Sequence, residues 1–274
     1  MPISALALAL GSAFVHAGWN LLLARARDPQ AATALAMPIG CIAFAPVAAL
    51  TWDVRAAAVP YMAASALLEL GYFALLARAY ARGEMSAVYP LARGSAPVLV
   101  LVVSVAALGA SLSAGQVVGV LLVAAGVPAV RGLRGRGVPG QAWLAFGVGV
   151  CIAGYTLIDK EGLHHAAPLP YLDLVLVLPS ITYLALVGRS RGGARMRAQL
   201  DARVALAGLG MLGAYGLALA ALRLAAAAPV AAVRETSVVI GTALAAVVLH
   251  ERVGRLRVAG AVAIAAGVAA IALG

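Results

Sequence analysis

Long apolar runs separated by short polar connections dominate the chain. The hydrocarbon core of a bilayer needs about 20 apolar residues of helix, and fewer where polar flanks reach outward. Ten runs meet or approach this length, at residues 3–23, 31–50, 59–77, 85–108, 114–130, 142–158, 170–187, 204–222, 226–249 and 258–274. The pattern predicts an all-α integral membrane protein with ten transmembrane helices. The seventh run is interrupted by Asp173 and Pro179.

Composition agrees with a membrane protein and argues against a nucleic-acid partner. The chain is 64% hydrophobic and only 11% charged, far outside the range of soluble domains. Its formal charge of +10 comes from arginines that cluster in the connections, where positive charge is retained on the cytoplasmic face. We expect the partners to be the lipid bilayer and a small-molecule solute, with protons as candidate coupling ions, in a monomer or homodimer without a cofactor or metal. Cys41 and Cys151 lie inside apolar runs and are expected to be packing residues.

The two halves of the sequence repeat at a constant spacing. Two glycines and two arginines of the first half recur 141 positions later in the second half. The matched pairs are Gly119 with Gly260, Gly126 with Gly267, Arg82 with Arg223 and Arg93 with Arg234. We therefore predict a first five-helix repeat at 1–130, an Arg-rich linker at 131–141 and a second repeat at 142–274.

Five helices per repeat is an odd number, so the second repeat must enter the membrane in the opposite sense. The predicted fold therefore consists of two inverted-topology five-helix repeats, with a binding site near the midplane where they meet. Lys and Arg lie mostly in the connections after the odd-numbered helices, which would place both termini outside.

Four short motifs spread over the whole chain resemble the drug/metabolite transporter superfamily, in its ten-helix EamA-type branch. They are His16-Ala-Gly-Trp-Asn20, Tyr89-Pro-Leu-Ala-Arg93 with Pro97, Leu112-Ser-Ala-Gly-Gln-Val-Val-Gly119 and Leu249-His-Glu-Arg-Val253. The resemblance implies a multi-pass protein of the bacterial inner membrane that moves a small metabolite, such as an amino acid or organic acid, by an ion gradient or exchange. Export is the expected direction. Relatives usually keep both termini cytoplasmic, so the resemblance and the arginine distribution leave the orientation open.

Relatives of this kind often have Glu where the fourth helix gives way to the fifth. Glu251 fills the equivalent place in the second half, but Ala110 stands there in the first half. This difference favours a structural role for Glu251 over half of a symmetric site.

Polar and aromatic side chains share faces of several predicted helices. A charge deep in a membrane helix is costly unless it faces a partner or a watery cavity, which makes Arg93 a candidate for binding an anionic group. The candidate solute-binding residues are Trp19, Asn20, Tyr72, Tyr89, Arg93, Tyr155 and Arg234. The candidate proton-coupling residues are Glu69, His16 and Glu235. We expect a central cavity among helices 1, 3, 4, 6, 8 and 9, with helices 5 and 10 packed outside it through glycine faces.

Other interpretations of the polar residues stay open. Glu69 and Arg93 could simply neutralise each other within the bundle. Arg234 and Glu235 are adjacent on one helix and point about 100° apart, so one can line the cavity while the other contacts a neighbouring helix. The stretch from Asp159 to His165 is expected to be a solvated connection, because its spacing does not favour a metal site.

The chain lacks the usual phosphate-loop, zinc-protease and nucleophile-elbow motifs, so we expect no enzyme. The alternative function is an integral membrane lipid-handling protein or an interfacial membrane enzyme. Such a protein would gather its polar residues at one membrane face, whereas a transporter holds them at mid-span.

Overall fold

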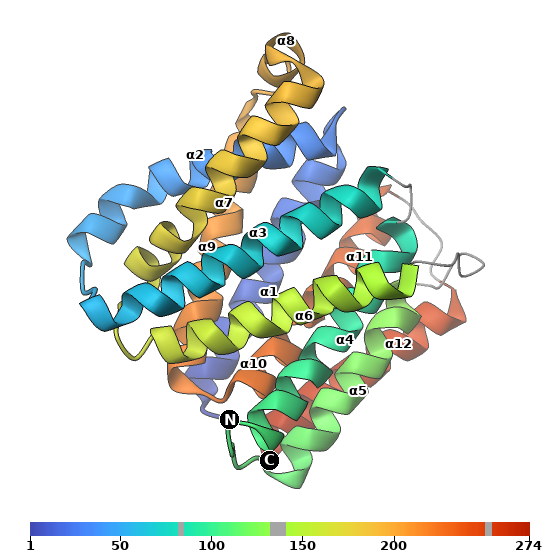
Figure 1. Ribbon diagram of the computed structural model, residues 1–274. Helices are drawn as coiled ribbons and strands as arrows, with labels where there is room; N and C mark the ends of the chain where they lie inside the picture. The colour runs from blue at the N-terminus through green and yellow to red at the C-terminus, as the bar shows by residue number, and fades with distance from the viewer. Residues whose placement is uncertain (82–84, 132–140, 250–253) are drawn as a thin grey trace.

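The structure is a computed structural model that describes residues 1–81, 85–131, 141–249 and 254–274. These residues are almost entirely helical (Figure 1). The helices are α1 (Ile3–Ala24), α2 (Pro29–Leu50), α3 (Val59–Ala81), α4 (Met85–Ala106), α5 (Ala114–Arg131), α6 (Gln141–Gly162), α7 (Pro168–Arg191), α8 (Gly193–Arg197), α9 (Ala202–Leu224), α10 (Ala227–Arg234), α11 (Thr236–Leu249) and α12 (Arg255–Leu273), with a 3-10 turn at Ala56–Ala58.

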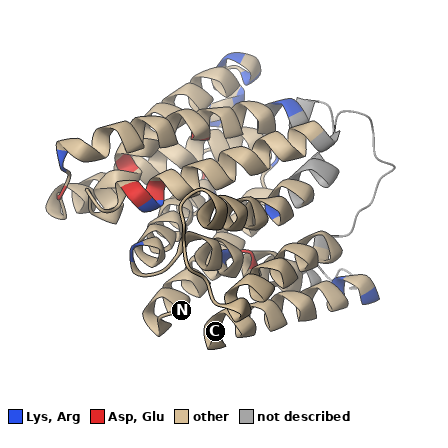
Figure 2. Ribbon diagram, turned by 60° about the horizontal axis from the view of Figure 1, so that its bottom comes forward, with Lys and Arg blue, Asp and Glu red and all other residues tan. Residues whose placement is uncertain are grey.

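Within the described residues, eight segments are long and apolar enough to cross a membrane, and one of them, Ala227–Leu244, combines α10 with the start of α11. The remaining two predicted crossings correspond to shorter apolar segments, Leu91–Ala106 in α4 and Ala114–Val130 in α5. Lys, Arg, Asp and Glu take up little of the ribbon and lie mostly near helix ends (Figure 2). The prediction of an all-α integral membrane protein is confirmed, whereas the count of ten crossings stays a prediction.

The seventh predicted helix is continuous in spite of its polar residue and its proline. Helix α7 contains Pro179 and reaches Arg191, four residues beyond the predicted end. It ends at Gly192, whose φ of 80° is a backbone conformation that favours glycine. The short helix α8 follows inside the Arg-rich connection, where the sequence predicted no helix.

Helices α5 and α12 form a close antiparallel pair through glycines. A Cβ atom on Gly119 would lie 2.5 Å from the Gly267 carbonyl oxygen, and one on Gly126 would lie 2.7 Å from the Gly260 oxygen. Since higher numbers on one helix meet lower numbers on the other, the two helices run in opposite directions. The fifth and tenth predicted helices correspond to α5 and α12, and the prediction that they pack through their glycine faces is confirmed.

These glycine contacts also express the inverted repeat. Adding 141 to Gly119 gives Gly260, and subtracting 141 from Gly267 gives Gly126, so each contact maps onto the other. A two-fold relation that exchanges the two helices and reverses their direction produces this pattern.

The other helix pairs follow the same relation. The packing of α1 on α9 is matched by α6 on α3, and that of α2 on α9 by α7 on α3. Helix α4 packs on α6 as α10 and α11 pack on α1, while α2 packs on its own equivalent, α7. The largest cluster of buried apolar residues joins both repeats, from the α5–α12 contact to α7, α9 and α10. The halves therefore share one interior.

A break divides the ninth predicted helix, which the sequence had indicated as one continuous helix at 226–249. Helix α10 ends at Arg234 and α11 begins at Thr236. The Glu235 amide donates to the Ala232 carbonyl at 3.0 Å, and the Val238 amide donates to the Glu235 carbonyl at 2.9 Å. Both are i to i−3 bonds of the tighter 3-10 type, which places Glu235 at a turn between two helical segments.

Candidate functional site

A buried ion pair joins the two repeats at the break beside Glu235. The Nε atom of Arg93 on α4 donates to Oε2 of Glu235 at 3.1 Å. The Nη2 atom of Arg93 donates to the Ser237 hydroxyl at 3.3 Å. Arg93 is 9% exposed and Glu235 is 4% exposed, so each offsets the desolvation cost of the other.

A second buried cluster surrounds Asp159 near the end of α6. Its Oδ1 accepts from the hydroxyls of Ser65 at 2.6 Å and Tyr171 at 3.0 Å. Its Oδ2 accepts from the Tyr215 hydroxyl at 2.8 Å. The donors come from α3, α7 and α9, so one carboxyl on α6 ties together helices of both repeats. Three donors also satisfy both oxygens of a carboxyl group that is only 1% exposed.

Tyrosines on α6 and α9 connect the two clusters. The ring of Tyr215 lies 6.0 Å from that of Tyr155, and the Arg234 guanidinium lies 5.6 Å from the Tyr215 ring. Glu69, which is 4% exposed, lies near the Tyr215 hydroxyl, Asp159 and Arg234. Tyr155 is within electrostatic range of both arginines, Arg93 and Arg234. The result is one continuous polar region inside the bundle.

The structure brings most of the predicted site residues together. Glu69, Arg93, Tyr155, Arg234 and Glu235 lie in this polar region, and Tyr72 packs against the apolar cluster that contains Tyr155. The ion pair of Arg93 is with Glu235 and not with Glu69, so the interpretation in which Glu69 neutralises Arg93 is wrong.

The adjacent residues Arg234 and Glu235 point to different partners, as their spacing predicts. Arg234 lies over Tyr215 of α9, while Glu235 binds Arg93 of α4. The side chain of Tyr89 and all of Glu251 lie outside the described part of the structure.

The predicted residues of α1 belong to a different environment. Trp19 packs with an apolar cluster of α1, α2 and α9, and its ring stands edge-on to His16 with centroids 4.7 Å apart. The Asn20 amide donates to the carbonyl of His16 within the same helix at 2.8 Å. In the described part of the chain, the buried indole N–H of Trp19 has no hydrogen-bond acceptor.

Asp159 corrects the sequence interpretation of its segment. The sequence placed it in a solvated connection because the apolar run stops at Ile158, but α6 continues to Gly162 and carries Asp159 into the interior. The described residues contain no group of three or more His, Cys, Asp or Glu side chains that could hold a metal ion.

Sequence reasoning also missed the partners of these charges, which are Ser65, Tyr171, Tyr215 and Ser237. The only signal for them was a set of single hydroxyl groups within otherwise apolar runs. Serines in helices commonly bond to the backbone of their own helix, and a single tyrosine in an apolar run does not identify its partner, so the sequence does not reveal the long-range role.

An integral membrane bundle of two inverted repeats, with charged groups buried where the repeats meet, has the architecture of many secondary transporters. The chain belongs to the EamA-like transporter family, which matches residues 3–130 and again residues 140–273. This confirms the resemblance that the motifs indicated. A solved structure described only as the crystal structure of a protein has the same fold, with a TM-score of 0.74, 17% identity and 98% of each chain covered. No curated protein matches the chain.

Proposed function

We propose that the protein is a secondary transporter of a small carboxylate-bearing metabolite, such as an amino acid or organic acid, and that it works by alternating access. The observation that carries the proposal is the buried Arg93–Glu235 ion pair between the repeats, located at a helix break. If the two repeats move relative to each other, the ion pair between them can be formed in one state and broken in another. A solute or a proton can then shift the balance between these two states.

The geometry of Arg93 supports a carboxylate as the group that it binds. Its Nε and Nη2 atoms form one edge of the planar guanidinium, and this edge now holds Glu235 and Ser237. A carboxylate can accept both bonds of such an edge in the two-point geometry that favours arginine. A solute carboxylate would therefore compete directly with Glu235.

This competition couples the solute to a proton. When the solute occupies Arg93, an ionised Glu235 would lose this ion pair while it stays buried, at a cost of several kcal/mol. Protonation of Glu235 removes that charge, so the solute anion and a proton are expected to bind together. Glu69 is the second proton-coupling candidate, because it lies next to the Tyr215 hydroxyl in the same polar region.

The aromatic residues supply surface for the rest of the solute. Tyr155 and Tyr215 lie between the two charge clusters, and Tyr72 packs against the same apolar group. The unsatisfied indole N–H of Trp19 supports a polar contact from α1 in another state. We further propose export across a bacterial inner membrane, as the family resemblance implies.

The test is transport in proteoliposomes with an imposed pH gradient, read against a panel of amino and organic acids. Arg93→Ala is expected to abolish transport of the anionic solute. Glu235→Gln and Glu69→Gln are expected to keep solute exchange, while at least one of them loses accumulation driven by the pH gradient. Glu161→Gln is the matched control, because Glu161 is exposed at the end of the same bundle.

The opposite outcome is well defined. If Arg93 and Glu235 only stabilise the fold, each single variant should lower the yield of folded protein, and the double variant Arg93→Ala/Glu235→Gln should restore both yield and transport. That result would reject the proposal, as would normal pH-driven accumulation by both glutamine variants.

A further inference from the structure

A pocket of about 500 Å³ lies at one end of the bundle, between the end of α1 and the start of α9. Its lining includes the arginines Arg25, Arg27 and Arg203, the carboxylate Asp201, and the apolar side chains of Leu22 and Val204. Neither Arg93 nor Glu235 lines it. The pocket is therefore a separate site.

The pocket lies at the ends of two segments that are long and apolar enough to cross a membrane. The membrane-spanning segment of α1 ends at Ala24, and that of α9 begins at Ala202. Arg25 and Arg27 lie one and three positions beyond the end of the α1 span, and Arg203 is the second residue of the α9 span, while Leu22 and Val204 each lie two positions inward from a span end. The site thus has an apolar side towards the hydrocarbon and a cationic side towards water.

The charge of the pocket is net positive and uncompensated by ion pairs. Within the described residues the two ion pairs are Arg93–Glu235 and Arg191–Asp28, so none involves Arg25, Arg27 or Arg203. Asp201 caps α9 by accepting from the Val204 amide at 2.9 Å, which occupies one of its oxygens within the helix end. Three guanidinium groups against one carboxylate favour an anionic ligand.

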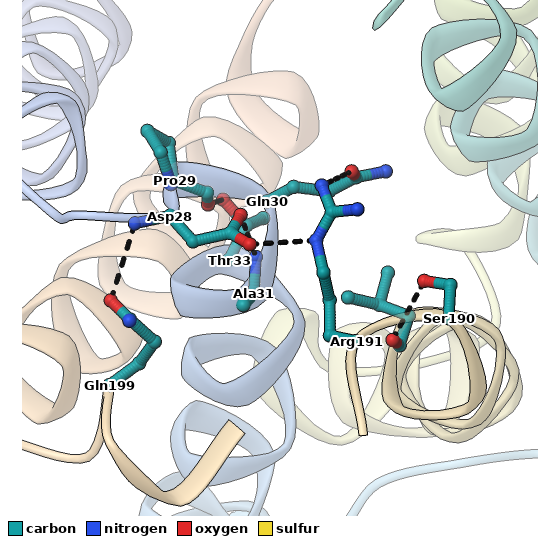
Figure 3. Close-up of polar contacts among 9 residues, drawn as sticks. Asp28, Pro29, Gln30, Ala31, Thr33, Ser190, Arg191 and Gln199 are labelled. Carbon is teal, nitrogen blue, oxygen red and sulfur yellow. Dashed lines mark hydrogen bonds and ion pairs between the residues drawn. The ribbon is translucent and has the colours of Figure 1, made fainter. Parts of the chain in front are cut away.

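The carboxylate of Asp28, which follows Arg27 in the chain, binds Arg191 of α7 (Figure 3). Asp28 binds the Nε of Arg191 at 2.7 Å, and Arg191 also donates to Gln30 at 3.0 Å. Although burial alone would raise it, the pKa of Asp28 is lowered by bonds from the Ala31 amide and Arg191. The carboxylate of Asp28 is therefore ion-paired with Arg191 and not with an arginine of the pocket.

The same network fixes the wall of the pocket. The Asp28 amide donates to the side-chain oxygen of Gln199 at 3.4 Å, and Gln199 lines the pocket. Since α1 belongs to the first repeat and α9 to the second, the lining of the pocket comes from both repeats. A ligand here contacts both halves.

We propose that this pocket binds a phosphate-bearing anion through Arg25, Arg27 and Arg203, and that the phosphate is supplied by the headgroup of an anionic phospholipid. Arginine binds phosphate oxygens through two parallel hydrogen bonds, as it binds a carboxylate, and phosphate is the anion that a membrane surface supplies. Basic pockets between transmembrane helices are a known mode of headgroup recognition. A bound headgroup would stabilise the contact between the repeats at this end of the bundle.

The experiment measures lipid binding to the full-length protein in an uncharged detergent, by native mass spectrometry and by the midpoint of thermal unfolding. Phosphatidylglycerol is expected to bind and to raise the midpoint, and phosphatidylcholine is not. Each basic residue near an anionic surface contributes a factor of about five in affinity, so Arg25→Gln/Arg203→Gln is expected to weaken phosphatidylglycerol binding about 25-fold. Arg27→Gln provides a milder variant, with a loss of about fivefold.

The control variant Arg189→Gln/Arg195→Gln removes the same charge at exposed positions outside the pocket and is expected to bind phosphatidylglycerol as the wild type does. Glycerol phosphate without acyl chains distinguishes the source. If it protects the wild type as well as the lipid does, and the pocket variants lose that protection, the phosphate comes from a soluble ligand. Equal phosphatidylglycerol binding by the pocket variants and the control, or none by the wild type, would overturn the proposal.

Discussion

Replacing Gly119 by alanine tests the close contact between α5 and α12. The new Cβ atom would lie 2.5 Å from the Gly267 carbonyl oxygen and 2.6 Å from Cγ1 of Ile271. To reach an ordinary contact of 3.4 Å, the helices must separate by about 0.9 Å at this point. A gap of this size forfeits between a quarter and a half of the dispersion energy of the atoms that it parts.

We therefore expect Gly119→Ala to destabilise the protein by about 1–3 kcal/mol, the usual cost of overpacking. Gly11→Ala is the control, because a Cβ atom there meets only Cδ1 of Leu217, at 3.8 Å. Adding Gly267→Ala to Gly119→Ala should cost less than the sum of the two single changes, since the first change already opens the shared contact. The assay is thermal unfolding of the purified protein in detergent. Equal midpoints for Gly119→Ala and Gly11→Ala would refute the glycine packing.

Three further predictions concern individual polar contacts. The pKa of Asp28 is lowered from 3.8 in the folded protein, so its contribution to the free energy of unfolding is complete above about pH 4. That contribution is lost as the pH falls through the pKa of the folded state, and stability measured against pH for Asp28→Asn should lack this acid step. Asp159→Asn should destabilise the protein by about 1–3 kcal/mol, because the amide nitrogen cannot accept a hydrogen bond and one of the three hydroxyl donors loses its acceptor. Glu161→Gln, at an exposed position, should not destabilise it. Equal unfolding midpoints for the two variants would contradict this prediction. Ser12→Ala removes a buried bond to the Ala214 carbonyl and should cost about 1 kcal/mol in the same assay, with Ser12→Cys as a control of similar size.

The sequence was most informative about the elements that depend on length and spacing. Apolar runs of about 20 residues identify membrane helices because every backbone polar group must be satisfied within the helix. The offset of 141 between Gly119 and Gly260 indicated the repeat, and the α5–α12 contact follows from it. These features are local or periodic, so they can be read from one sequence.

The sequence was less informative about contacts between distant residues. The break at Glu235 occurs without a proline or glycine at that position, so local sequence gave no sign of it. Asp159 was assigned to a loop because the apolar run ended one residue earlier. The hydroxyl groups that donate hydrogen bonds to its carboxylate lie on three other helices, so the sequence did not reveal them. Arg93 was recognised as a site residue, but its partner lies 142 positions away and could not be inferred from helical spacing.

The ion pair between Arg93 and Glu235 lacks an equivalent under the repeat. The offset of 141 relates Arg93 to Arg234, but it relates Glu235 to Gly94. If alternating access exchanges the conformations of the two halves, the exchanged state would place Arg234 opposite a residue without a side chain. The two access states would then differ in electrostatic energy even without a solute or a gradient, because one state contains a buried ion pair that the other cannot form. Under the proposed alternating access, a preferred resting orientation would be a property of this sequence, and a bound solute would have to supply enough differential affinity to overcome it.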